Sequence, residues 1–234
     1  MRKLVVFNQI TLDGYFSGPN GDISWAHKQD PEWNEFAAGN AKGGGMLLFG
    51  RVTYEMMASF WPTEAARQRM PEVAEGMNTL PKVVFSRTLR ETPWKNTRLV
   101  KGDMVTEVRK MKSEPGPGMV ILGSGSVVSQ LTEAALIDEL QIVVNPIVLG
   151  RGRTLFETVK KSVPLKRVDT RAFGNNSRKA ASVFAGAPKS QSLSNFGRSE
   201  ARTDGMGATT PKERARTAAH ILTVSILSPV DLLL

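Results

Sequence analysis

The chain has no cysteine and only two histidines among its 234 residues. The absence of thiols excludes disulfides, cysteine nucleophiles and cysteine-ligated zinc, and His27 and His220 are too few for a histidine-rich metal site. There is also no apolar run of roughly 20 residues, the length that a membrane-spanning helix needs. The apolar run at residues 4–7 is far shorter than a signal peptide requires. We therefore expect a cytoplasmic enzyme or binding protein with no membrane partner.

Positive charge is in modest excess, with a formal net charge of +9. Residues 175–234 carry +4 of this charge and residues 1–174 carry +5. Neither part contains a dense basic stripe with interleaved aromatic residues, so we expect no nucleic-acid partner. A moderately basic cleft for a phosphorylated small molecule explains the charge equally well.

Two kinds of segment alternate along residues 1–174, which we assign to one domain. Strand-like segments lie at 3–10, 46–49, 82–85, 97–101, 119–122, 139–146 and 165–173. Helix-like segments lie at 31–38, 53–59, 64–76, 103–111 and 126–134, with a short turn at 155–158. Several of the strands are apolar without alternation, which suits a parallel sheet covered on both faces. The sequence therefore predicts an α/β sandwich built from strand–helix–strand units.

The last 60 residues have a different composition. Residues 175–234 are rich in Ser, Gly, Ala, Thr, Arg and Asn and show no sustained period. Such a segment buries too little apolar surface to offset its ordering entropy. We predict a mostly disordered tail, in which residues 181–185 are the one candidate for a remnant strand.

Two junctions between a strand and a helix suggest a ligand. Each is an apolar run that stops at glycine and passes directly into a helical pattern, the first at Gly50 and the second at Gly123. Glycine allows a ligand to approach the backbone closely, and the start of the following helix favours an anion. Two such junctions at the carboxyl edge of one sheet predict a cofactor with two phosphates, such as a dinucleotide.

Five segments in order resemble the dihydrofolate-reductase-like family, and in particular the group that contains the reductase domain of riboflavin biosynthesis. They are KLVVFNQITLDGYFSGPNGDISW, LLFGRVTYE, KVVFSRTL, VILGSGSVVSQL and LIDELQIVVNPIVLGRGRTLFE, and the resemblance covers about residues 2–174. It implies a three-layer sandwich around a mostly parallel sheet. It also implies an NADPH-dependent reductase that transfers a hydride to a pterin- or aminopyrimidine-type substrate, similar to 5-amino-6-(5-phosphoribosylamino)uracil reductase.

The resemblance assigns cofactor contacts to three turns. These are Gly50, Arg51 and Thr53 for the phosphates, Ser86 and Arg87 for the 2′-phosphate, and Gly123, Ser124, Gly125 and Ser126 beneath the nicotinamide and pyrophosphate. The chemistry agrees, because a helix start, a hydroxyl and a guanidinium all bind phosphate. Each turn also has a plain structural explanation, as a turn glycine with a solvated arginine, a polar strand-end turn and a glycine-rich loop.

On the substrate side, the resemblance makes Asp13 and Asp30 candidate catalytic acids and places Trp25, Gly150 and Gly152 around the substrate. Asp13 is also explained as part of an Asp-Gly turn. Asp30 is equally well placed to cap a helix that begins at Pro31, and Glu32 is similarly placed in the first turn of that helix. A true dihydrofolate reductase would need Asp30 or Glu32 in the pocket.

The chain also departs from the family. Phe7 stands where riboflavin reductases have a lysine, and residues 53–59 replace their Thr-Val-x-x-Asp-Asn-Pro segment, which leaves the substrate open. The match stops abruptly near residue 175, so we hypothesise a reading-frame change there, which would remove the last strand of the sheet. A non-catalytic NADPH-binding paralogue is an alternative to an enzyme, and the family resemblance also suggests a homodimer.

Overall fold

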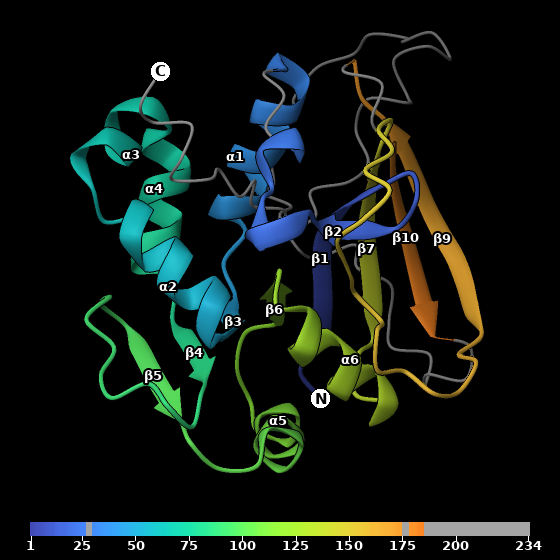
Figure 1. Cartoon of the computed structure of the whole chain (residues 1–234). Helices are drawn as coiled ribbons and strands as arrows, with labels where there is room; N and C mark the ends of the chain where they lie inside the picture. Colours follow the sequence, from blue (N-terminus) through green and yellow to red (C-terminus); the bar gives the residue numbers. More distant parts are fainter. Residues whose placement is uncertain (27–29, 175–177, 185–234) are drawn as a thin grey trace, which may run out of the picture.

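The strands form one large sheet with helices on both faces. In the computed structural model, which describes residues 1–26, 30–174 and 178–184, eight strands lie in the order β5-β4-β3-β6-β1-β7-β10-β9. Figure 1 shows this order from β5 on the left to β9 on the right. The strands are β1 (Leu4–Thr11), β3 (Met46–Gly50), β4 (Lys82–Phe85), β5 (Thr97–Val100), β6 (Met119–Leu122), β7 (Glu139–Asn145), β9 (Leu165–Ala172) and β10 (Arg178–Phe184).

The six strands from β5 to β7 run parallel to one another. Strand β10 lies antiparallel between β7 and β9. The predicted mostly parallel sheet within an α/β sandwich is therefore confirmed. A second, two-stranded sheet pairs β2 (Tyr15–Ser17) with β8 (Arg153–Thr154), and these two short strands were not predicted.

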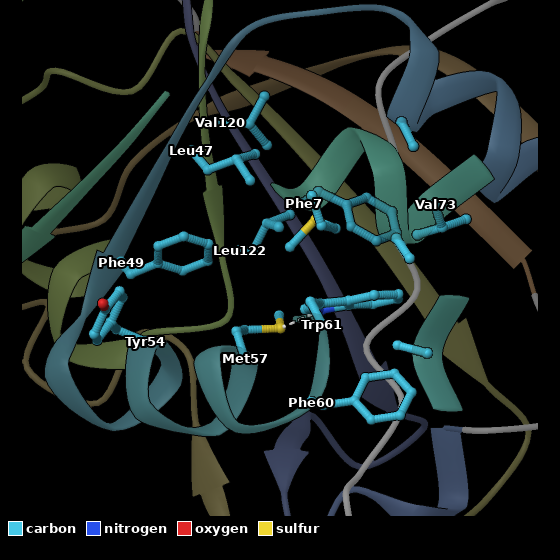
Figure 2. Close-up of a cluster of buried hydrophobic side chains, with 14 of the residues drawn as sticks. Phe7, Leu47, Phe49, Tyr54, Met57, Phe60, Trp61, Val73, Val120 and Leu122 are labelled. Atoms are coloured by element: carbon cyan, nitrogen blue, oxygen red, sulfur yellow. Dashed lines mark hydrogen bonds between the residues drawn. The ribbon is translucent and has the colours of Figure 1, made fainter. Parts of the chain in front are cut away.

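Alternate residues of the parallel strands enter two different cores, one on each face of the sheet. Leu47 and Phe49 of β3 belong to one core, and Leu48 between them belongs to the other. Both faces of the sheet are therefore buried in an apolar core, which explains why these strands are apolar throughout. Figure 2 shows the first core, which includes Phe7 of β1 and in which Trp61 Nε1 donates to Met57 Sδ.

The helices are α1 (Pro31–Lys42), α2 (Arg51–Phe60), α3 (Glu64–Arg69), α4 (Pro71–Thr79), α5 (Met104–Ser113) and α6 (Gly125–Glu133), with single 3-10 turns at Pro19–Gly21 and Ser24–Ala26. Helices α1 and α5 begin where capping residues predict, because Asp30 accepts a hydrogen bond from Trp33 N and Asp103 accepts one from Thr106 N. The turn at 155–158 is also present. None of the helices in the described ranges is long and apolar enough to cross a membrane.

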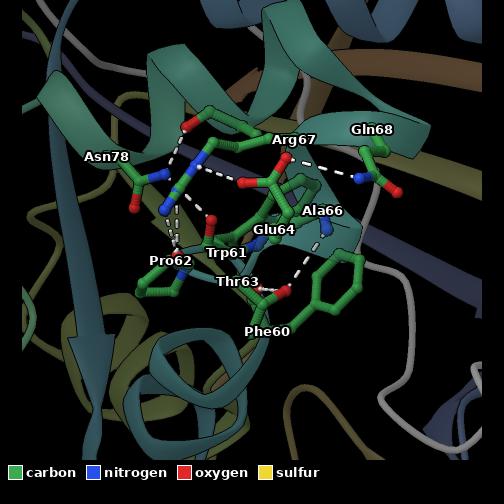
Figure 3. A network of polar contacts seen from close by, with 10 residues as sticks. Phe60, Trp61, Pro62, Thr63, Glu64, Ala66, Arg67, Gln68 and Asn78 are labelled. Atoms are coloured by element: carbon green, nitrogen blue, oxygen red, sulfur yellow. Dashed lines mark hydrogen bonds and ion pairs between the residues drawn. The ribbon is translucent and has the colours of Figure 1, made fainter.

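One predicted helix is two helices. The prediction of a single helix over 64–76 is wrong because the chain leaves the helical conformation at Met70, with φ −143° and ψ 64°. Met70 precedes Pro71, and a residue before proline is disfavoured in the α-region. The linker before α3 is held by polar contacts, since Asn78 Nδ2 donates to Trp61 O at 2.9 Å and Arg67 donates to Pro62 O (Figure 3). These contacts hold the end of α2 against α4 and so fix the position of α2, whose first residue is Arg51.

The carboxyl-terminal part of the sheet corrects the predicted domain boundary. Residues 178–184 form β10 and fill the position between β7 and β9. The predicted disorder is wrong for these residues, the candidate strand begins earlier than residue 181, and no ladder position between β7 and β9 is left open. Residues 185–234, on which the rest of the tail prediction falls, lie outside the described residues.

Candidate functional site

Both predicted junctions open at the same edge of the sheet. Strands β3 and β6 are parallel neighbours, with Leu48 paired to Ile121, so their carboxyl ends lie side by side. Helix α2 starts directly after β3, and α6 starts two residues after Gly123. A cavity of about 1010 Å³ lies over this edge, large enough for a dinucleotide together with a small substrate.

All nine residues predicted to bind the cofactor line this cavity. They are Gly50, Arg51, Thr53, Ser86, Arg87, Gly123, Ser124, Gly125 and Ser126. They come from three separate turns of the chain, after β3, β4 and β6. The fold thus brings the nine predicted residues together in the wall of one cavity. That these residues bind a cofactor stays a prediction.

The two junctions are joined by hydrogen bonds. Gly50 N donates to Ser124 Oγ at 2.8 Å, and Ser124 N donates to Thr53 Oγ1 at 3.1 Å. Each hydroxyl accepts a backbone proton and keeps its own proton to donate. The pair of junctions therefore offers two hydroxyl donors at fixed positions in the cavity wall.

The backbone of the second junction is unusual. Gly123 has φ +57° and Ser124 has φ +59°, both in the left-handed region. A Cβ at Gly123 would lie 3.1 Å from Thr53 Cγ2, so the position needs glycine for space as well as for conformation. The peptide between these two residues is trans, as are all peptides in the described ranges. Ser124 adopts a conformation that costs a non-glycine residue on the order of 1 kcal/mol.

The helix starts can hold negative charge. The first N–H groups of α2 and α6 have no partner within their helices, and Arg51, Thr53 and Ser126 lie beside them in the cavity lining. Arg51 is half exposed and pairs with Glu55 at 2.8 Å. The fixed N–H groups, hydroxyls and guanidinium of this wall fit a pyrophosphate.

The turn after β4 has the internal hydrogen bonds of a polar strand-end turn, and its binding of a 2′-phosphate stays a prediction. Ser86 Oγ accepts hydrogen bonds from Thr88 N at 3.2 Å and Leu89 N at 3.0 Å, so the polar strand-end turn is real. Ser86 and Arg87 also line the cavity, as does Asp103. The pKa of Asp103 is lowered, first by hydrogen bonding to Thr106 and also by the nearby charges of Arg109 and Arg87. A ligand at this end meets a cation and an anion together.

Asp13 does not reach the cavity lining. Its carboxylate accepts hydrogen bonds from Thr11 Oγ1 at 2.6 Å, Gly150 N at 2.7 Å and Leu149 N at 3.1 Å. The hydrogen bond from Thr11 lowers the pKa of Asp13, and the bonds from Gly150 and Leu149 lower it further. A carboxyl group with a lowered pKa is a poor proton donor at neutral pH. The structure assigns Asp13 to bracing the loop after β7, which differs from the predicted catalytic role.

Asp30 and Glu32 are also engaged outside the cavity lining. Asp30 is buried and caps α1 through Trp33 N at 2.8 Å. Glu32 forms an ion pair with Arg171 at 2.8 Å and accepts from Gly174 N. The structural alternative for Asp30 is therefore realised, and the described lining contains neither acid.

The predicted substrate residues divide into two groups. Trp25 and Gly152 line the cavity, whereas Gly150 is outside its described lining and donates to Asp13. Trp25 is 8% exposed, and its buried Nε1 has no acceptor among the residues that the structure describes. A Cβ at Gly152 would overlap the carbonyl oxygen of Ser17, so Gly152 allows β8 to approach β2.

Sequence reasoning missed three side chains in the cavity wall. Asn8 is 4% exposed and donates to Gly123 O at 3.3 Å. A polar residue inside the apolar strand 3–10 was its available signal. Phe16 covers Gly125, where a Cβ would lie 2.7 Å from Phe16 Cε1, and Arg153 lies over the Phe16 ring. No local sequence pattern predicts the positions of Phe16 and Arg153, because β2 and β8 come together only in the folded chain.

Comparisons with known proteins agree with this architecture. The sequence model of the RibD C-terminal domain matches residues 2–177. The protein YyaP of Bacillus subtilis (strain 168), itself uncharacterized, is 29% identical over 174 residues, covering 74% of this chain and 90% of YyaP.

Two solved structures share the fold. A protein of Shewanella sp. PV-4 named after riboflavin biosynthesis superposes with a TM-score of 0.61 at 23% identity, covering 78% of this chain and 99% of that one. Dihydrofolate reductase from Enterococcus faecalis, complexed with NADP(H), superposes with a TM-score of 0.51 at 17% identity, covering 78% and 96%. At these identities the likeness shows the fold, which is dihydrofolate-reductase-like as the sequence predicted.

Proposed function

The chain belongs to the RibD C-terminal domain family, and we propose that it is an NADPH-dependent reductase. The observation that carries this proposal is the single wall formed by the two hydrogen-bonded junctions. The seven predicted residues of these junctions, with Ser86 and Arg87 of the turn after β4, line a cavity of the right size for a dinucleotide and a substrate. When bound, NADPH supplies the hydride that reduces a pterin- or aminopyrimidine-type compound.

The protein's own contribution is binding and orientation. The starts of α2 and α6, with Arg51 and Thr53, hold the pyrophosphate. Gly123 and Gly125 let Thr53 and Phe16 lie close against the second junction, and Phe16 and Trp25 line the cavity with rings that exclude water. Fixing two rings in a dry site lowers the entropic part of the barrier.

The proton that accompanies reduction comes from water in this proposal. Asp13, Asp30 and Glu32 are all committed to backbone or arginine contacts. Asp103, the one carboxylate in the described lining, lies at the end of the cavity bounded by Ser86 and Arg87. The proposed enzyme therefore aligns its substrate without a carboxylic acid as proton donor.

The same arrangement disfavours a true dihydrofolate reductase, which would need Asp30 or Glu32 in the pocket. It gives some support to a non-catalytic NADPH-binding paralogue, because the described lining has no evident acid on the substrate side. NADPH titration followed by a reductase screen separates these cases. An enzyme consumes NADPH with a pterin or aminopyrimidine present, whereas a paralogue binds NADPH and consumes none.

A further inference from the structure

Three arginines line the cavity, and they differ in what neutralises them. Arg51 pairs with Glu55 at 2.8 Å. Arg87 lies close enough to Asp103 to contribute to the lowered pKa of that carboxyl. Arg153 has no carboxylate partner among the described residues, and its guanidinium lies over the Phe16 ring, at 6.0 Å from the centroid. The uncompensated positive charge of the cavity is therefore that of Arg153.

The position of Arg153 is set by strand β8, which runs past the start of α6. The carbonyl oxygen of the next residue, Thr154, lies 3.5 Å from where a Cβ of Gly125 would be. Phe16, the ring beneath the Arg153 guanidinium, covers the same glycine. Arg153, Gly125 and Ser126 line one cavity, so the guanidinium and the first N–H groups of α6 face the same space.

The loop that carries Arg153 is braced on both sides. Before it, the Asp13 carboxylate accepts from Leu149 N and Gly150 N. After it, Leu155 O accepts from Ser129 Oγ of α6 at 2.8 Å, in a buried contact. Arg153 itself is paired with Ser17 across the β2–β8 ladder. Because these hydrogen bonds already hold the backbone of the loop, the loop loses less conformational entropy when Arg153 binds a ligand.

We infer that Arg153 binds a phosphate group held at the start of α6, and that this phosphate belongs to the cofactor. The inference rests on the proposed function. A pyrophosphate carries two negative charges, and Arg51, which is shared with Glu55, offsets only part of them. Arg153 supplies the second cation from strand β8. Asp13 thereby becomes a positioning residue for the loop that presents Arg153.

The test is a fluorescence titration of the full chain with NADPH, without substrate, at several salt concentrations. Arg153→Gln is expected to raise the dissociation constant about tenfold, the usual effect of losing one charge-assisted contact. Arg153→Lys should recover most of the affinity. The Gln variant should also show a weaker salt dependence, because one screened charge pair is gone. The melting temperature of the ligand-free protein should not change.

The matched control is Arg167→Gln on β9, an exposed arginine outside the described cavity lining, which should bind NADPH like the wild type. If Arg153→Gln also binds like the wild type while Arg51→Ala binds weakly, the inference is wrong and the proposed function stands. If the wild type does not bind NADPH, both are wrong. If Arg153→Gln changes only the KM of a phosphorylated substrate, the assignment of the phosphate to the cofactor is wrong.

Discussion

The backbone N–H of Gly50 donates to the side-chain hydroxyl of Ser124 at 2.8 Å, across 74 residues of sequence. This hydrogen bond joins the end of β3 to the start of α6. The two junctions of the proposed cofactor wall are therefore one structural unit, so a substitution at one junction should also alter the structure of the other.

Ser124→Ala removes the acceptor of that bond but keeps a β-carbon in the left-handed region. We expect a loss of about 1 kcal/mol in the free energy of unfolding, and weaker NADPH binding. Ser124→Gly removes the same bond but relieves the backbone cost, so it should lose less stability than Ser124→Ala. Urea denaturation of the two variants checks this order, and equal or reversed losses would contradict the role of the left-handed backbone.

Gly123→Ala tests whether the second junction needs space as well as conformation. A Cβ at Gly123 meets Thr53 Cγ2 at 3.1 Å, whereas a Cβ at Gly150, with φ +72°, meets nothing within 4 Å. Both variants lose the conformational freedom of glycine, on the order of 1 kcal/mol. Only Gly123→Ala should lose more than this and also bind NADPH poorly. Similar denaturation curves and similar binding for both would show that packing at Gly123 is unimportant.

Asp13→Asn separates a brace from a catalytic acid. We expect the amide protons of Leu149 and Gly150 to exchange faster, because the charged acceptor is lost, while kcat at saturating NADPH changes little. Hydrogen exchange and steady-state kinetics measure the two effects. The brace assignment fails if kcat collapses while the exchange of both amides stays as in the wild type.

Lys82 gives a prediction for stability against pH. It is 1% exposed, donates to Leu80 O at 2.6 Å and to Asn78 O, and lies over the Trp94 ring. Burial lowers the pKa of Lys82 from 10.5 to about 8. Between these two values the unfolded chain holds a proton that the folded chain has released, so stability rises with pH across this window. The free energy of unfolding therefore rises by up to about 3 kcal/mol in total as the pH increases through this window.

Lys82→Met should lack this rise. The measurement is the difference between the unfolding free energies of wild type and Lys82→Met from pH 7.5 to 10.5, in which the contributions of the groups that both proteins share cancel. We expect the difference to move in favour of the wild type as the pH increases. A constant difference would contradict the lowered pKa.

Particular residues show what the sequence could and could not predict. The apolar strands and the glycines at Gly50 and Gly123 predicted the parallel core and the two junctions that line the cavity, because their signals are local. Pro71 was equally visible, yet the break it causes was overlooked. The sequence allowed Asp13 and Asp30 either a place in the pocket or a structural role. Only the tertiary contacts show that Asp13 accepts hydrogen bonds from the loop after β7 and that Asp30 caps α1. Arg153 and Phe16 had no signal at all, because their positions depend on two strands, β2 and β8, that are far apart in the chain.

The most direct measurement of the central claim is an NADPH titration of the wild type and Arg51→Ala, with Arg167→Ala as the control. If the junctions bind the pyrophosphate, the wild type binds NADPH and Arg51→Ala raises the dissociation constant by about tenfold, with the control unchanged. Equal affinities for the wild type and Arg51→Ala, or a wild type that does not bind NADPH, would contradict the account.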